Sequence, residues 1–204
     1  MSENKKRVGI MGGTFNPIHL GHLIIAEAAY EAFDLDEVLF VPSGISYMKD
    51  QSEILDAKKR VHMTGLAIED NPHFALSTIE IDRDGNSYSY ETLETLRKQN
   101  PNTEYFFLVG ADTLFALETW KHPEILLPSC TILVAVRDGV PVDEMKKQAK
   151  YLEDKFGGCI ELLITPNIEI SSTDIRKKLA EGRNVKYFLP DTVLDFINKY
   201  ELYK

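Results

Sequence analysis

The sequence predicts an α/β protein whose doubly wound, mainly parallel sheet carries helices on both faces, as in Rossmann-like folds. Two observations predict this class. Apolar runs of strand length alternate along the chain with longer segments of helical pattern, and parallel strands require such helical crossovers. The run at 104–110 (EYFFLVG) is apolar through most of its length, which is typical of a strand buried on both faces.

The expected strands are short runs rich in Val, Ile, Leu and Phe. They cover residues 7–11, 37–42, 74–82, 104–110, 131–137 and 159–164. The expected helices show apolar residues at helical spacing, and two of them are closed by Asn-Pro. They cover residues 20–33, 57–70, 89–99, 141–156, 171–181 and 190–200.

No repeat, low-complexity segment or linker interrupts this alternation, so residues 1–204 are expected to form one domain. In open α/β sheets, ligands bind beyond the carboxyl ends of the strands, where the strand order switches. The loops after the first, second and fourth strands are therefore where we expect the chemistry.

Composition excludes several classes of function. The 204 residues carry a formal net charge of −9 with a pI near 5.1, so a nucleic-acid polymer is not an expected partner. No stretch approaches the roughly 20 apolar residues that span a membrane, and a cytoplasmic protein is expected. Cys130 and Cys159 lack metal-ligand spacing and are expected to be buried, reduced thiols. The sequence leaves open whether the chain forms a homo-oligomer.

The segment 12–22 (GGTFNPIHLGH) leaves the first strand and enters the first helix. Its glycines let the backbone approach a ligand, and the helix start offers N–H groups to phosphate. It is neither the dinucleotide-binding GxGxxG fingerprint nor a P-loop. His19 and His22 share one helix face, and Gly21 between them leaves room for a ligand. From the residues alone, the histidines could make ordinary hydrogen bonds, bind zinc with a third ligand, or donate together to an anion.

A second segment, 170–176 (ISSTDIR), combines hydroxyl groups, a helix start and an arginine. Ser171 and Asp174 alone form a capping box, which needs no ligand. The same hydroxyls, with Arg176 one turn further on, would also bind phosphate well. The local pattern leaves both interpretations open.

Both segments resemble motifs of the nucleotidyltransferase α/β phosphodiesterase superfamily. GGTFNPIHLGH is similar to its (T/S)F-x-P-x-H-x-G-H signature, and ISSTDIR to its ISSTxIR motif, which holds the β- and γ-phosphates. These enzymes catalyse attack on the α-phosphate of a nucleoside triphosphate and release pyrophosphate. The resemblance implies that the histidines donate to the phosphates, and that the helical part from about residue 171 completes the phosphate site.

Other stretches resemble bacterial nicotinate-nucleotide adenylyltransferases across nearly the whole chain. Residues 80–93 are similar to the family's E-x-x-R-x-G-x-S-Y-T-x-x-T-L stretch, and residues 107–120 to its G-A-D-x-L…W block. Residues 187–191 match its C-terminal tail. Phosphopantetheine adenylyltransferases usually lack the first two stretches.

The sequence departs from the family pattern at three places. The family's Pro-Pro-His-Lys loop is replaced at 46–49, where Met48 stands for the histidine and Lys49 remains. Ser89 replaces the threonine of the SYT stretch and keeps its hydroxyl. Asn16 replaces a frequent aspartate, which weakens a metal-binding role there.

The resemblance implies adenylyl transfer from ATP to nicotinate mononucleotide, giving deamido-NAD and pyrophosphate, a step of NAD biosynthesis. The implied catalytic residues are His19, His22, Lys49 and Arg176. The residues implied to bind ATP are Gly12, Gly13, Thr14, Phe15, Gly110, Asp112, Ser171, Ser172 and Thr173. Those implied to bind the nicotinate nucleotide are Asn16, Ser87, Tyr88, Ser89 and Trp120. No metal site is expected in the protein itself, and Mg²⁺ is expected to enter bound to ATP.

Alternatives remain from other acceptors and other classes of function. An enzyme of the same superfamily could use nicotinamide mononucleotide or phosphopantetheine as its acceptor, and a non-catalytic nucleotide sensor could share the fold. An NAD-dependent oxidoreductase is disfavoured by the missing GxGxxG. Asp112 and Ser89 could instead cap the helices that they begin, and Trp120 could pack in the core.

Overall fold

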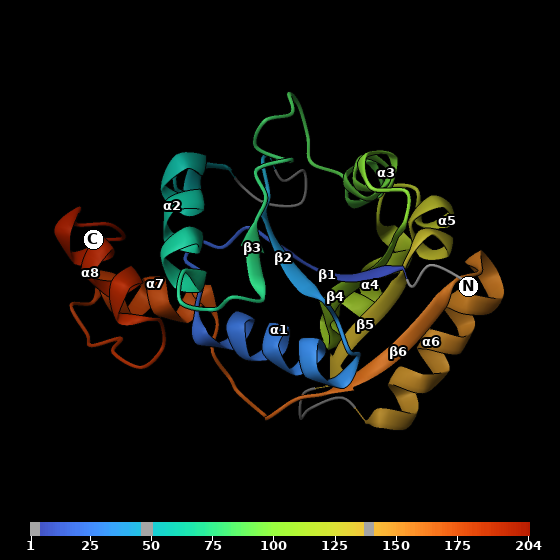
Figure 1. Cartoon of the computed structure of the whole chain (residues 1–204). Helices are drawn as coiled ribbons and strands as arrows, with labels where there is room; N and C mark the ends of the chain where they lie inside the picture. Colours follow the sequence, from blue (N-terminus) through green and yellow to red (C-terminus); the bar gives the residue numbers. More distant parts are fainter. Residues whose placement is uncertain (1–4, 46–50, 137–140) are drawn as a thin grey trace.

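The computed structural model describes residues 5–45, 51–136 and 141–204, and it confirms the doubly wound α/β class. Six strands form one sheet in the order β3-β2-β1-β4-β5-β6, and every neighbouring pair is parallel (Figure 1). The strands are β1 (Lys6–Gly13), β2 (Glu37–Pro42), β3 (Phe74–Leu76), β4 (Thr103–Gly110), β5 (Thr131–Val136) and β6 (Cys159–Ile164). The order reverses between β1 and β4, as the doubly wound prediction requires.

Helices cover both faces of this sheet. They are α1 (Leu20–Ala32), α2 (Ala57–Ile68), α3 (Ser89–Gln99), α4 (Ala111–Ala116), α5 (Pro123–Leu126), α6 (Val142–Phe156), α7 (Ser172–Ala180) and α8 (Asp191–Lys199). One apolar cluster joins α1, α2, α7 and α8 to one face. A second joins α3, α4, α5 and α6 to the other.

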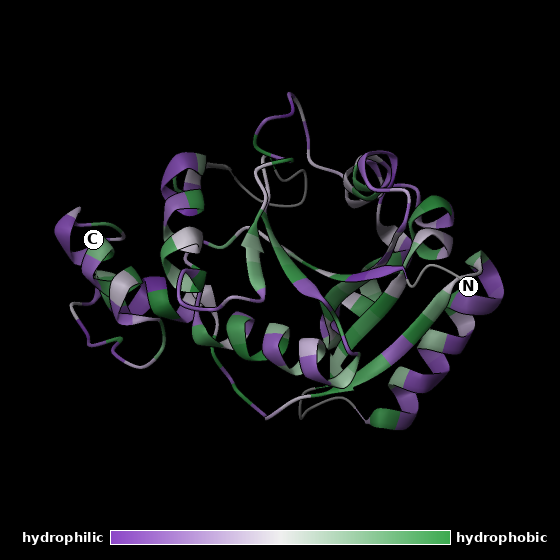
Figure 2. Ribbon diagram, viewed as in Figure 1, coloured by the Kyte–Doolittle hydropathy of each residue, from purple (hydrophilic) through white to green (hydrophobic). Residues whose placement is uncertain are grey.

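Strand β4 shows how one sequence serves both clusters. Phe106 and Leu108 belong to the first cluster, while Tyr105, Phe107 and Val109 belong to the second. Successive side chains of a strand point to opposite faces, so an unbroken apolar run is needed to fill both. Figure 2 shows the strands as mainly hydrophobic and α6 as hydrophilic on its side turned away from the sheet.

The expected strand at 74–82 is wrong beyond Leu76. The backbone N–H groups of Ile81 and Asp82 both donate to the Thr78 carbonyl, at 2.7 and 2.9 Å, so the chain turns here. The turn buries Glu80, which is 8% exposed. Ile79 and Ile81 on either side of it are only half-buried, so the buried side chain of this turn is a carboxyl group and not an apolar one. Helices α4 and α5 are too short to show a helical period, so neither was among the expected helical ranges, and only the possible capping role of Asp112 pointed to α4.

Two other expectations concern the cysteines and membrane-spanning segments. Cys130 and Cys159 are both free thiols, but Cys159 is exposed at the start of edge strand β6, so the expectation of burial is wrong for it. Within the described ranges, no helix is long and apolar enough to cross a membrane.

Candidate active site

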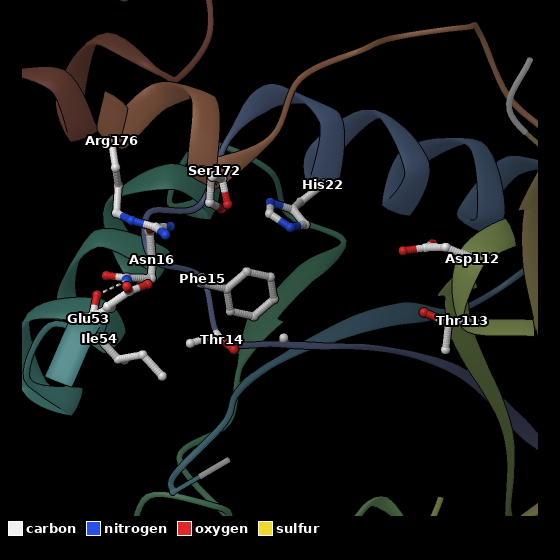
Figure 3. Close-up of a pocket in the computed structure, with 12 residues that line it drawn as sticks. Thr14, Phe15, Asn16, His22, Glu53, Ile54, Asp112, Thr113, Ser172 and Arg176 are labelled. Atoms are coloured by element: carbon white, nitrogen blue, oxygen red, sulfur yellow. Dashed lines mark hydrogen bonds between the residues drawn. The ribbon is translucent and has the colours of Figure 1, made fainter. Parts of the chain in front are cut away.

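A cavity of about 510 Å³ lies at the carboxyl ends of β1 and β4, where the strand order reverses. This is the place that the fold class predicts for a ligand. Figure 3 shows Arg176 and Asn16 on one side of it, Asp112 on the other, and His22 between them. The residues that line it are Gly13, Thr14, Phe15, Asn16, His22, Glu53, Ile54, Asp112, Thr113, Ser172, Thr173 and Arg176.

The two histidines stack at the start of α1. Their ring centroids are 3.7 Å apart, and the backbone N–H of His19 donates to Nδ1 of His22 at 3.2 Å. Because Nδ1 accepts this bond, the neutral His22 ring carries its proton on Nε2. Phe15 packs edge-on against the same ring, with centroids 5.0 Å apart. These contacts fix the orientation of a donor at the cavity wall.

His19 supports this arrangement from a buried position. It is 4% exposed and is not among the residues that line the cavity. A Cβ atom added at Gly21 would lie 3.0 Å from Nδ1 of His19. The missing side chain at Gly21 therefore makes room for the His19 ring, and the expectation that it also leaves room for a ligand stays a prediction.

The capping interpretation of the 170–176 segment is confirmed for Ser171, whereas phosphate binding by the other residues stays a prediction. Ser171 Oγ accepts the backbone N–H of Asp174 at 3.1 Å and donates to its carboxylate at 2.8 Å, so it caps α7. Ser172, Thr173 and Arg176 line the cavity. Ser172 Oγ donates to the carbonyl of Pro17 at 2.8 Å, which ties α7 to the loop that carries the histidines.

Asp112 lies across the cavity from Arg176 (Figure 3). Gly110 is the N-cap residue of α4 and Asp112 lies in the first turn, so Asp112 does not cap this helix. A Cβ atom added at Gly110 would lie 2.7 Å from Oδ1 of Asp112, and the glycine therefore permits this placement of the carboxylate. An exposed carboxylate here can accept hydrogen bonds from the hydroxyls of a ligand.

Arg60, on α2, holds three loops of the site together from within. It is 2% exposed, and burial lowers the pKa of its guanidinium. Its Nη1 donates to the carbonyl of Thr14 at 2.7 Å, its Nη2 to that of Ser43 at 2.8 Å and its Nε to that of Leu55 at 3.0 Å. The ends of β1 and β2 and the segment that follows η1 (Gln51–Glu53) are thereby joined by one side chain.

The 80–92 stretch is arranged around a buried carboxyl group. Thr92 Oγ1 donates to Oε1 of Glu80 at 2.8 Å, and burial raises the pKa of this carboxyl. Ser87 connects the stretch to the loop after β2, since its Oγ accepts the Gly44 N–H at 3.0 Å. A second cavity of about 360 Å³ lies here, lined in part by Gly44, Glu80 and Arg83.

Ser89 begins α3 but does not cap it, because the N-cap residue is Tyr88. The first intrahelical bond runs from the Thr92 N–H to the Tyr88 carbonyl, so the backbone N–H groups of residues 89–91 are those of a helix N-terminus. Trp120 is half-buried and packs edge-on against Phe107, with ring centroids 6.2 Å apart. It lines neither of the two cavities.

Comparisons with known proteins identify the family. The solved structure of a Plasmodium falciparum nicotinic acid mononucleotide adenylyltransferase complexed with NaAD shares this fold, with a TM-score of 0.81 over 97% of both chains at 22% identity. Residues 10–178 match the family model of cytidylyltransferase-like proteins. A protein from Lachnoclostridium phytofermentans is 46% identical over 97% of this chain and 99% of its own length. One from Thermoanaerobacter sp. is 43% identical over 99% of this chain and 96% of its own length. Both are named "Probable nicotinate-nucleotide adenylyltransferase".

This chain belongs to the nicotinate-nucleotide adenylyltransferase family. Its cavity brings together eight of the residues implied to act on ATP, from both ends of the chain: Gly13, Thr14, Phe15, His22, Asp112, Ser172, Thr173 and Arg176. Gly12, Gly110, Ser171 and His19 are not among the lining residues. The roles of all these residues remain predictions.

The residues implied to bind the acceptor of this adenylyltransferase are more dispersed. Asn16 lines the first cavity, whereas Ser87, Tyr88, Ser89 and Trp120 line neither cavity. Lys49 lies outside the described residues, as does Met48 beside it.

Several residues of the site went unnoticed in the sequence. Glu53, Ile54 and Thr113 line the cavity, and Arg60 braces it. Thr113 follows Asp112 directly, so the family's G-A-D block could have pointed to it. Arg60 gave no such signal, because the AKKR start of its helix looks like a solvated charged face.

The first test of the site concerns Arg176. If it binds phosphates of ATP in the ground state, Arg176→Ala should raise KM for ATP by roughly 10- to 100-fold, the effect of losing hydrogen bonds to a charged group. Arg176→Lys should recover only part of this loss, because lysine lacks the bidentate fork. Steady-state kinetics with varied ATP measures both. Arg183→Ala, which changes an exposed arginine near the end of α7, is the matched control, and unchanged ATP kinetics in Arg176→Ala would remove Arg176 from the site.

Proposed function

We propose that this chain transfers the adenylyl group of ATP to nicotinate mononucleotide, giving deamido-NAD and pyrophosphate. The observation that carries the proposal is that His22, Arg176 and Asp112 line the same cavity, at the point where the strand order reverses. A cation, a donor and an acceptor in that order suit an extended nucleoside triphosphate, with its phosphates at Arg176 and His22 and its ribose at Asp112. The curated relatives named "Probable nicotinate-nucleotide adenylyltransferase" match this chain over almost the whole length of both proteins, which supports the same activity.

The chemistry that the residues support is positioning and charge stabilisation. A phosphate oxygen of the mononucleotide attacks the α-phosphorus, and the bond from that phosphorus to the bridging oxygen breaks, releasing pyrophosphate. The nucleophile is already an anion at neutral pH, so no general base is required. His22 Nε2–H would donate to the phosphate oxygens as charge grows, and Arg176 would hold the β- and γ-phosphate oxygens.

Mg²⁺ is proposed to arrive with ATP. Among the described residues, no group of three or more His, Cys, Asp or Glu side chains could hold a metal ion. The carboxylates and hydroxyls that the cavity does offer suit an ion coordinated chiefly by triphosphate oxygens and water. When bound, the ion would neutralise phosphate charge.

The acceptor is proposed to bind near the start of α3. The helix N-terminus there offers backbone N–H groups with the positive end of the helix dipole, which suits the nicotinate carboxylate. Arg83 Nη1 lies 3.5 Å from the Glu91 carboxylate, which offsets the negative charge in the first turn. Trp120 would stack on the pyridine ring.

Trp120 offers a direct optical test of this acceptor site. It is the only tryptophan, so its emission should change when nicotinate mononucleotide is added. Trp120→Ala should raise KM for the mononucleotide roughly 3- to 10-fold, the value of a stacked aromatic pair, and leave KM for ATP within about twofold. Trp120→Phe should keep most of the affinity. If the tryptophan emission does not change at a saturating concentration of the mononucleotide, Trp120 has only a packing role in the core.

The competing functions are separated by one pyrophosphate-release assay. ATP is supplied with nicotinate mononucleotide, nicotinamide mononucleotide or 4′-phosphopantetheine, and we expect the first to be the preferred acceptor. Preference for either of the others would support a different adenylyltransferase. Binding of ATP without release of pyrophosphate in the presence of any of the three acceptors would support a nucleotide sensor.

The organisation of the whole chain is part of the proposal. We propose that it acts as one nucleotidyltransferase domain, in which the part from residue 171 completes the phosphate site. The bonds from Ser172 to Pro17 and from Arg176 to Asn16 support this. A cytoplasmic location remains a prediction.

A further inference from the structure

The last residues of the chain fold back toward the nucleotide cavity. After α8, Glu201 and Tyr203 take left-handed conformations, with φ of 49° and 63°. Leu202 between them is 5% exposed and belongs to the core cluster that also holds α1 and α2. Such conformations are unfavourable for residues with side chains and persist where surrounding contacts hold them. Here they turn the terminal segment inward.

The Tyr203 hydroxyl donates to Oδ1 of Asn16 at 2.9 Å. Asn16 is 4% exposed and lies three residues before His19, inside the GGTFNPIHLGH motif. Burial raises the pKa of the Tyr203 phenol, so the group stays a neutral O–H donor. A residue next to the C-terminus therefore bonds directly to the loop that forms the floor of the cavity.

Asn16 is a junction between separate walls of that cavity. Its Nδ2 donates to the carbonyl of Glu53 at 3.0 Å, and its Oδ1 also accepts the Leu55 N–H at 3.2 Å. Its backbone carbonyl accepts from Nη1 of Arg176 at 3.0 Å. The amide therefore has one orientation that satisfies all its partners, and Tyr203 supplies one of the two donors that define it.

We propose that Tyr203 is a positioning residue for the triphosphate end of the nucleotide cavity, acting through the Asn16 side chain on the Glu53–Leu55 segment. This inference rests on the proposed function, because it assumes that the cavity binds ATP. Tyr203 itself is not among the lining residues, so it acts without touching the nucleotide. Losing its hydroxyl would leave the Asn16 amide held by Glu53 and Leu55 alone and would loosen the wall that these two residues form.

The test compares Tyr203→Phe with Tyr200→Phe. Both changes remove one phenolic hydroxyl near the C-terminus, but Tyr200 is 51% exposed and packs on Phe196 away from the cavity. ATP affinity is measured by titration calorimetry with the full chain, and KM for nicotinate mononucleotide by kinetics. Tyr203→Phe should weaken ATP binding about 3- to 10-fold, as expected for one lost hydrogen bond, while the mononucleotide KM stays within about twofold. Tyr200→Phe should change neither.

An NMR readout separates positioning from a general loss of stability. The side-chain amide signal of Asn16 in an ¹⁵N-resolved NMR spectrum should move in Tyr203→Phe and not in Tyr200→Phe. Unchanged ATP affinity in Tyr203→Phe, or equal weakening of both substrates with an unmoved Asn16 signal, would overturn the proposal. A wild-type chain that binds no ATP would overturn the proposed function itself, a result distinct from either.

Discussion

His22→Ala is expected to lower kcat by about 10²- to 10³-fold, the usual effect of removing one preorganised donor to a developing anion. The structure indicates which atom of His22 is the donor. The backbone N–H of His19 donates a hydrogen bond to Nδ1 of His22, so Nε2 is the nitrogen that carries the donor proton at the cavity wall. Because orientation is set by that bond and by the Phe15 ring, little reorganisation is needed when charge develops.

His62→Ala is the matched control for this variant. His62 lies on the exposed side of α2 and packs against Phe196, so its removal should leave kcat unchanged. Stopped-time measurement of pyrophosphate at saturating substrates gives both values. A folded His22→Ala protein that keeps more than half the wild-type kcat would remove His22 from the mechanism.

His19→Ala should lower kcat too, but with a loss of stability that His22→Ala does not share. The ring is buried and stacked on His22, so its removal leaves a gap and frees the His22 ring to turn. A melting temperature that falls along with kcat would be consistent with this supporting position. The sequence alone led us to expect two equivalent ligand-facing histidines.

The second large effect expected is a preference for the acid over the amide, with kcat/KM at least about 10²-fold higher for nicotinate than for nicotinamide mononucleotide. A carboxylate only accepts hydrogen bonds, whereas the amide's NH₂ would face the N–H groups at the start of α3 and leave donors unpaired. Each such buried mismatch costs about 1–3 kcal/mol, so two account for the ratio.

Ser89→Ala tests where this preference arises. If the Ser89 hydroxyl is one of the donors, its loss should weaken the acid more than the amide and lower the ratio of kcat/KM values. Competition between the two mononucleotides in the wild type gives that ratio directly. Equal kcat/KM for both would defeat the acceptor assignment and make the enzyme a dual-specificity adenylyltransferase.

Much of the fold and the phosphate site could be predicted because the determinants are local. The glycine pair at 12–13 and the apolar run at 104–110 mark the two strands that flank the switch, and the ISSTDIR segment marks a helix start. Ligand binding at a strand end or helix start depends on a few residues that are adjacent in sequence, so a short sequence motif is enough to identify them. The His22, Asp112 and Arg176 positions follow from this.

What could not be predicted depends on contacts between distant segments. Asn16 and Tyr203 are 187 residues apart in sequence, and no local pattern pairs them. Arg60 looked like part of a charged helical face, yet three backbone carbonyls satisfy it in the interior. The 74–82 stretch was misassigned as one strand, because the backbone turn at Thr78 and the burial of Glu80 against Thr92 are not visible in the local apolar pattern.

The central claim is that the adenylyl group of ATP moves to the phosphate of nicotinate mononucleotide in this cavity. It is tested most directly by supplying ATP labelled at its α-phosphate together with unlabelled nicotinate mononucleotide and separating the products. We expect the label to appear in deamido-NAD, with one pyrophosphate released for each dinucleotide formed. Label that remains in ATP, or that appears only in AMP or ADP, would contradict the account.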